Sequence, residues 1–445
     1  MTCRTNGVAL LLASTLMAGT AEAQITLEQA MVRAYAGNPT LLADREGLKV
    51  LDEDVATARS GGRPTLVGEA NLTRSEIDVA GTGGIYGARL TQPLYRGSRI
   101  RNNVNAAETN VLAGRESLRQ SEIDILLGVV DAYSAVLRDQ EILELNRNMV
   151  QILDGVRAAE QRRLDLGERT KTDVSQAQAR LSGVLASVSV AERRLAESRA
   201  RFRSIVGDDA DQLVALPPLP QMPSSRDDAV AIAEDNSPRL LQAKHAMKVS
   251  DYQLKSAKGA LLPSLDASAA VNHRNEIVQI LGRKVNQDLA TFQLVLTVPL
   301  FQGGAEYAAV RRAKHTREVR LHEIDEASRE VMAEVSVAWD RLVTARVAEA
   351  AYVEATKANE VAVAGVRREA LGGTRTTLDI LDAERELRDA KIAHVTAAHE
   401  EYIAGFRLIA AMGKATAADL NLPVDRYDPA SHYRRAAGRW IGFEP

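Results

Sequence analysis

Charged side chains that could act together occur in two stretches of the sequence, residues 371–390 and residues 166–181. In the first, Asp379 and Asp382 are three residues apart, so a helix would carry both carboxylates on one face. Repeated around an opening, such a pair favours cations and opposes anions through its electric field. The alternative is that the two acids stabilise a helix N-terminus, a common role for acids in a first turn.

Asp173 in the second stretch and Arg375 in the first carry opposite charges at corresponding corners of the chain. Both can be solvated surface charges, and an exposed ion pair contributes under about 1 kcal/mol.

The other residues with reactive side chains form no catalytic or metal-binding pattern. The seven histidines have no HExxH or related spacing, and His394 and His399 share no helix face, which predicts solvated surface positions. The sequence has no Walker A loop and no dinucleotide-binding fingerprint, and its single cysteine is Cys3. We therefore expect no enzyme activity, no cofactor and no metal site. Any energy that the function of the protein requires must come from a partner.

The two charged stretches are copies of one motif. A constant offset aligns identical residues: Gly167 with Gly373, Arg169 with Arg375, Thr170 with Thr376, and Asp173 with Asp379. Prolines 39, 64 and 93 precede a proline-free run over 94–216, and prolines 238, 263 and 299 precede one over 300–422. The sequence therefore predicts two structural repeats, residues 24–223 and 224–422, and a tail at residues 423–445.

Hydrophobic periodicity predicts the elements that position the two stretches. The first repeat is expected to contain a helix from Thr26 to about Arg59, a β-hairpin over 64–95, a long helix over 97–166, a return helix over 170–206 and a Pro-rich linker. The second is expected to contain a helix from Ser225 to about Lys258, a hairpin over 263–301, a long helix over 303–372 and a return helix over 376–412. Each long helix would extend about 100 Å. The two shorter helices of a repeat would lie end to end beside it. Each long helix carries an apolar stripe: Leu126, Leu127, Val130, Tyr133 and Leu137 in the first repeat, and Val331, Val335, Ala338, Leu342 and Ala345 in the second. The second stripe is thinner and richer in alanine, which predicts a coiled-coil seam.

Both hairpins show the alternating pattern of half-buried strands. Leu66, Ala70 and Leu72 alternate with polar residues, and so do Phe292 and Leu294. Each strand has about ten residues, which is enough to cross a bilayer when tilted. Turns are expected at residues 80–84 and 275–288. Because four strands cannot close a barrel and an open edge cannot lie in lipid, several subunits would have to share one barrel. The alternative is a small sheet in a soluble protein.

The N-terminal residues indicate an exported protein. Residues 1–23 combine Arg4, an apolar run and the cleavage pattern Ala21-Glu22-Ala23, which predicts a secretory signal peptide. No later segment is apolar over about 18 consecutive residues, so no transmembrane helix is expected. The net charge of −3 offers no basic excess for nucleic acid. The basic C-terminal residues predict a mobile tail: Arg434, Arg435 and Arg439.

This layout resembles the TolC family of outer-membrane efflux proteins, over essentially the whole mature chain. The resemblance rests on Gly-Thr-Arg-Thr-Thr-Leu-Asp at residues 373–379 and on the junctions Pro-Leu-Tyr-Arg-Gly (93–97) and Pro-Leu-Phe-Gln-Gly (299–303). It implies a mainly α fold with a transmembrane β part, in which long antiparallel coiled coils form a periplasmic tunnel. Four strands from each subunit would join a shared, trimeric, 12-stranded β-barrel in the outer membrane, with most of the chain in the periplasm. The homotrimer would bind a periplasmic adaptor (membrane fusion) protein and an inner-membrane ABC or proton-driven transporter, and conduct substrate passively.

The resemblance also implies roles for the charged residues. Asp379 and Asp382 match aspartates that ring the narrowest point, so a trimer would place six carboxylates there. Arg375 matches an arginine that holds the second corner against its neighbour, with Asp173 as its acidic partner. Ala370 stands where other members carry a tyrosine of this lock. The residues expected to support the gate are Thr376, Gly373 and Arg169.

Two export pathways and one non-conducting function fit these expectations. Gln24 at the mature N-terminus excludes lipid attachment there and, with the Gly-Thr-Arg-Thr corner, favours type I protein secretion. Drug or small-molecule efflux with a proton-driven pump is the alternative. A periplasmic coiled-coil scaffold without a channel is a third possibility from a different class.

Overall fold

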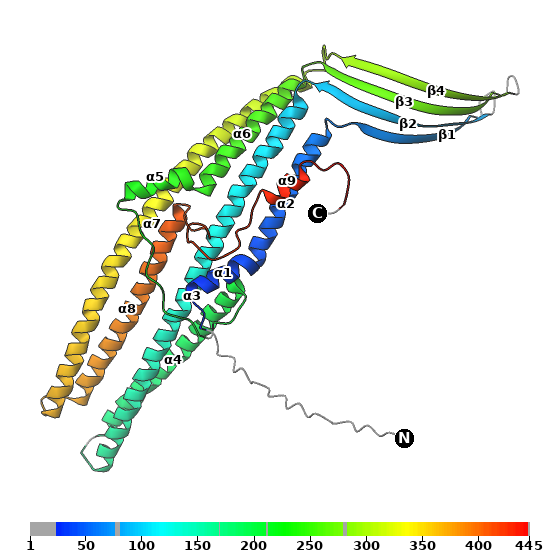
Figure 1. Cartoon of the computed structure of the whole chain (residues 1–445). Coiled ribbons are helices and arrows are strands. Elements are labelled where there is room, and N and C mark those ends of the chain that lie inside the picture. The colour runs from blue at the N-terminus through cyan, green and yellow to red at the C-terminus, as the bar shows by residue number, and fades with distance from the viewer. Residues whose placement is uncertain (1–23, 76–80, 169, 211, 279–282, 444–445) are drawn as a thin grey trace, which may run out of the picture.

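The computed structural model describes residues 24–75, 81–168, 170–210, 212–278 and 283–443. The signal peptide predicted at residues 1–23 lies outside them. The chain is elongated: a β-sheet forms one end, two helical hairpins form the other, and long helices connect the two ends (Figure 1). The same order of two helices, two strands and two helices occurs twice.

The elements of the two halves correspond one to one. The first half contains α1 (Leu27–Gly37), α2 (Pro39–Ser60), β1 (Thr65–Ser75), β2 (Gly81–Arg96), α3 (Arg99–Asp165) and α4 (Lys171–Val206). The second contains α5 (Arg226–Asn236), α6 (Pro238–Gly259), β3 (Ser264–Val278), β4 (Arg283–Thr297), α7 (Ala305–Leu371) and α8 (Thr377–Ala411), and α9 (Ser431–Ala436) follows.

The long helices α3 and α7 set the length of the molecule. Each has 67 residues, or about 100 Å at 1.5 Å per residue. Helices α2 and α4 lie along α3, and α6 and α8 lie along α7, while α6 also packs on α3 (Figure 1). None of the described helices is long and apolar enough to cross a membrane. The predicted mainly helical fold with four strands is confirmed.

A proline divides the helix that precedes each hairpin. The sequence predicts one helix there, but the structure has two, which meet at Asn38-Pro39 and at Ser237-Pro238. The residue before a proline avoids the helical conformation, and Asn38 accordingly has an extended backbone with ψ 123°. Its side chain accepts hydrogen bonds from the amides of Thr40 (3.0 Å) and Leu41 (3.4 Å), which caps α2.

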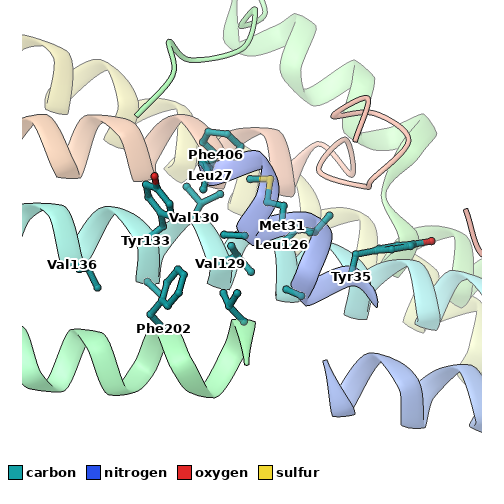
Figure 2. Packing of buried hydrophobic residues seen from close by; sticks show 14 of the residues in the cluster. Leu27, Met31, Tyr35, Leu126, Val129, Val130, Tyr133, Val136, Phe202 and Phe406 are labelled. Atoms are coloured by element: carbon teal, nitrogen blue, oxygen red, sulfur yellow. The ribbon is translucent and has the colours of Figure 1, made fainter. Parts of the chain in front are cut away.

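The largest apolar core lies halfway along α3, where α1 and α4 converge on it (Figure 2). Tyr133 is fully buried, and its ring lies 6.2 Å from the Phe202 ring of α4. The Tyr133 hydroxyl is 2.8 Å from the Ile25 carbonyl and 2.6 Å from the Val214 carbonyl, and burial raises its pKa to about 12. Two chain segments, around Ile25 and Val214, therefore close over the apolar stripe that contains Tyr133.

The four strands form one antiparallel sheet in the order β1-β2-β3-β4. The register places Leu66 opposite Leu90, Leu90 opposite Ala269 and Ala269 opposite Phe292, so the apolar positions of all four strands share one face. That face is open in the single chain: Leu66 is 73% exposed and Phe292 is 83% exposed.

The strands extend into the segments that the sequence predicts to be turns. Gly81, Gly83 and Gly84 were predicted in a turn, but the structure pairs them with β1, Gly84 opposite Leu72. In the second hairpin, Asn275 pairs with Asn286 and Ile277 with Lys284. Backbone pairing along the sheet therefore outweighs the turn preference of these polar and glycine residues. Residues 76–80 and 279–282 lie outside the described ranges.

The C-terminal tail is docked on α2, which corrects the expectation of a mobile tail. His432 of α9 is buried, with its Nδ1 3.1 Å from Asp52 Oδ2 and its Nε2 3.6 Å from Glu53 Oε1. Burial is the main cause that raises the pKa of the Asp52 carboxyl, and His432 opposes it. Arg59 of α2 donates a hydrogen bond to the Ala437 carbonyl at 2.7 Å.

A second correction concerns His399. The sequence spacing predicts a solvated position, but His399 of α8 is only 7% exposed. Burial and the nearby Arg138 cation lower the pKa of the imidazole from its ordinary value. His394, five residues earlier, is partly exposed and lies 3.4 Å from Glu349.

Candidate functional site at the helical corners

Each corner begins where a glycine ends a long helix. Gly167 after α3 has φ +77° and Gly373 after α7 has φ +78°, a conformation that side chains disfavour. The Gly373 amide donates to the Ala370 carbonyl at 3.1 Å, and the next amide, of Thr374, donates to the Glu369 carbonyl at 3.1 Å. These bonds satisfy the last carbonyls of the helix. Gly373 therefore shapes the second corner, in keeping with its predicted supporting role.

Each return helix begins with a capping box that uses a predicted site residue. Thr376 accepts from the Asp379 amide at 3.2 Å, and the Asp379 carboxylate accepts from the Thr376 amide at 2.8 Å. Thr170 and Asp173 repeat the arrangement at the first corner. The hydrogen bonds from Thr376 lower the pKa of the Asp379 carboxyl. Asp379 thus stabilises a helix N-terminus, while its role at a constriction stays a prediction.

Asp382 lies in an ion pair between two return helices. Its Oδ1 is 3.0 Å from Nη1 of Arg180, so the pair joins α4 to α8. Both side chains are partly exposed, which limits the contribution of the pair to about 1 kcal/mol. Arg180 lies within residues 166–181, but sequence reasoning missed it because its partner Asp382 lies on the other helical hairpin.

Arg375 has an acidic partner on its own corner. Its Nε is 2.9 Å from Glu369 Oε2, and both side chains are about half exposed. The predicted pairing of Arg375 with Asp173 of a neighbour involves a second copy of the chain, so it stays a prediction. Arg169, the matching arginine of the first corner, lies outside the described residues.

Two buried glutamates near the corners escaped the sequence analysis. Glu160 of α3 is 4% exposed and accepts a hydrogen bond at 2.9 Å from the hydroxyl of Thr377 in the first turn of α8. Glu384 of α8 is 5% exposed and forms an ion pair with Arg367 of α7. A usable signal exists for Glu160, because it lies seven residues after buried Leu153 on the same stripe.

The two corners meet around a cavity of about 210 Å³. Its lining comes from α3, α4 and the start of α8: Val156, Glu160, Asp173, Gln176, Ala177, Thr376, Thr377, Leu378 and Leu381. The structure therefore brings Asp173 and Thr376 to one site, while Asp379, Asp382, Arg375 and Gly373 lie outside its lining. Within the described residues, no group of three or more acidic, histidine or cysteine side chains is placed to hold a metal ion.

Comparison with known families fits this geometry. The family model described as outer membrane efflux protein matches residues 30–208 and 229–414, most of the chain. The chain belongs to the outer membrane efflux protein family.

Individual members of the outer membrane efflux protein family match nearly the full length. The outer membrane efflux protein BepC of Brucella suis is 35% identical, over 98% of this chain and 95% of the relative. The alkaline protease secretion protein AprF of Pseudomonas aeruginosa is 27% identical, over 82% of this chain and 80% of the relative. The crystal structure of the open state of the Neisseria gonorrhoeae MtrE outer membrane channel matches with a TM-score of 0.76 at 19% identity, covering 87% of this chain and 88% of that one.

These matches confirm the resemblance to the TolC family, the fold class and the outer-membrane location. As an outer membrane efflux protein, the chain is a channel of an export system and not an enzyme.

Proposed function

We propose that three copies of the chain form one outer-membrane duct that conducts substrate passively from an inner-membrane transporter and a periplasmic adaptor to the exterior. One observation carries this proposal: the exposed apolar sheet and the charged corners lie at opposite ends of the long helices (Figure 1). The sheet end suits lipid, and the corner end suits docking and gating about 100 Å away.

The edges of the sheet support a shared barrel. In the single chain, β1 pairs with β2 and β4 pairs with β3, so the outer edges of β1 and β4 carry backbone groups that a membrane cannot satisfy. Pairing the β4 edge of one copy with the β1 edge of the next removes both edges. Three copies then contribute twelve strands.

The proposed gate lies at the corners. Asp379 and Asp382 line the narrowest point, and Arg375 and Asp173 hold adjacent corners together in the closed state. Thr376 and Gly373 shape the second corner, and Arg169 acts at the first. The capping bonds of Asp379 support this proposal, because they hold an ionised carboxylate at a fixed place at the tip of α8.

We propose type I protein secretion with an ABC transporter as the export pathway. The Gly-Thr-Arg-Thr corner and a relative named for secretion of an alkaline protease support it. Drug or small-molecule efflux with a proton-driven pump is the second candidate, favoured by the 35% identical relative named as an efflux protein. The match to the outer membrane efflux protein family argues against a non-conducting periplasmic scaffold.

Two measurements test these proposals. Purified protein should migrate as a heat-modifiable trimer from outer-membrane fractions and conduct ions in planar bilayers. A soluble, non-conducting protein would contradict the proposed duct. Crosslinking in cells that produce the chain, followed by purification, should recover an ABC transporter with an adaptor. Recovery of a proton-driven pump instead would replace secretion by efflux.

A further inference from the structure

The C-terminal segment is held at the foot of the sheet. Arg63, two residues before β1, donates a hydrogen bond from Nη1 to the Arg439 carbonyl at 2.7 Å. The Arg63 guanidinium also lies 4.9 Å from the centre of the Trp440 ring, a cation–π distance. The segment after α9 therefore passes the start of β1, at the β1 side of the sheet and away from β4 (Figure 1).

This segment exposes three large apolar side chains, which we call the C-terminal apolar cluster. Trp440 is 66% exposed, Ile441 is 92% exposed and Phe443 is fully exposed. The backbone beside them is bonded to Arg63, so the cluster is presented at a defined place. Neighbouring exposed apolar side chains at a fixed place indicate a surface that another molecule covers.

A second exposed apolar pair lies at the foot of the opposite edge strand. Leu300 and Phe301, just after β4, are 90% and 80% exposed. Their counterparts in the first repeat, Leu94 and Tyr95, belong to β2. Tyr95 lies opposite Leu265 of β3, so the first copy of this pair has a neighbouring strand within the chain.

The pairing of β2 with β3 is a template for the free edge of β4. By sequence, β4 repeats β2 and β1 repeats β3, with Pro64 and Pro263 at matching positions. Because Leu66 corresponds to Leu265, the β2–β3 register places Phe301 opposite Leu66 of an adjacent copy. The same register keeps apolar residues on one face of the sheet, as expected for a continuous lipid-facing surface.

We propose that residues 439–443 pack against Leu300 and Phe301 of an adjacent copy of this chain and clasp the two subunits at the foot of the sheet. The proposal rests on the trimer of the proposed function. Leu66 is three residues after Arg63, and Arg63 contacts Trp440. If β4 of the adjacent copy places its Phe301 opposite Leu66, Phe301 also lies near Trp440. A second copy is the occupant because both apolar sets are exposed and the register brings them to the same edge.

A pair of engineered cysteines tests the clasp. Ile441→Cys with Phe301→Cys, in a Cys3→Ser background, should give covalent dimers and trimers on heated denaturing gels after treatment with a short bis-maleimide. Each single variant should give none. Ile441→Cys with Leu371→Cys is the matched control, since Leu371 is equally exposed but lies at the corner end. The unheated gel must show the trimer first; its absence contradicts the proposed function and not the clasp.

Tryptophan fluorescence tests the same contact without crosslinking. The sequence has two tryptophans, so Trp339→Phe leaves Trp440 as the only emitter. We expect the emission of a buried indole, with little quenching by brominated phospholipid. The emission should shift to longer wavelength when Leu300 and Phe301 are both replaced by alanine. Intact trimers without crosslinks overturn the proposal: strong quenching then assigns the cluster to lipid, and water-exposed emission leaves it without a partner.

Discussion

Glu160 of α3 accepts a hydrogen bond at 2.9 Å from the hydroxyl of Thr377, which starts α8. This contact joins the two helical hairpins of one chain next to the cavity between their corners. The Arg180–Asp382 pair, at 3.0 Å, joins the same hairpins through their return helices. Separation of the corners within one subunit therefore breaks both contacts.

Thr377→Val should loosen the closed state. The substitution keeps the shape of the side chain and removes the donor to a buried carboxylate, which costs about 1.5–3 kcal/mol, roughly tenfold or more in the ratio of closed to open channels. Single-channel recording in planar bilayers should show longer openings. Thr172→Val, an exposed position in the first turn of α4, is the control. Equal open times in both variants would remove this contact from the gate.

Asp379→Asn with Asp382→Asn should weaken cation preference. Six carboxylates become neutral in a trimer, so the field at the narrowest point falls. Reversal potentials across a KCl gradient measure the change, with Glu192→Gln of α4 as the control. In the native channel the lowered pKa of Asp379 keeps that carboxylate charged at acidic pH, so its part of the preference should disappear only below the ordinary pKa of an aspartate. Unchanged selectivity in the double variant would leave the two acids as helix-stabilising residues.

Arg375→Gln with Asp173→Asn should raise conductance if the two charges lock adjacent subunits. Asparagine retains an acceptor oxygen for the Thr170 amide, so the first corner keeps its cap. Glu369→Gln removes the partner of Arg375 within the chain. It should change conductance little, because that exposed pair contributes under about 1 kcal/mol. A larger effect of Glu369→Gln than of the double variant would assign Arg375 to its own corner.

The trimer should lose thermal stability at mildly acidic pH through His399. Its folded-state pKa is lowered, mainly by burial, so the unfolded chain binds the proton more readily. The stabilisation is therefore present above about pH 6.5 and is lost as pH falls through the folded-state pKa. Melting temperatures from pH 8 to 5 should fall in the native protein and change less in His399→Leu. His322→Gln, at an exposed position of α7, should behave like the native protein.

The sequence was sufficient for features that depend on neighbouring residues. The period of the long helices and the glycine at each corner are local, and the structure has each of them. The docked tail was missed because its contact, between His432 and Asp52, joins residues 380 positions apart. The contact of Glu160 was missed because its partner Thr377 lies on the other hairpin, although the position of Glu160 on the buried stripe indicates its burial.

The clamp around Tyr133 makes the long helix α3 a lever. Its hydroxyl is tied to two backbone segments and its ring packs against α4, so α3 is anchored at mid-length. From Tyr133 to Asp165 the helix extends about 50 Å further. A tilt of a few degrees at that fulcrum therefore moves the corner by several ångströms, which is comparable to the width of a side chain. A partner that rocks α3 near its middle can therefore move the corner without touching it.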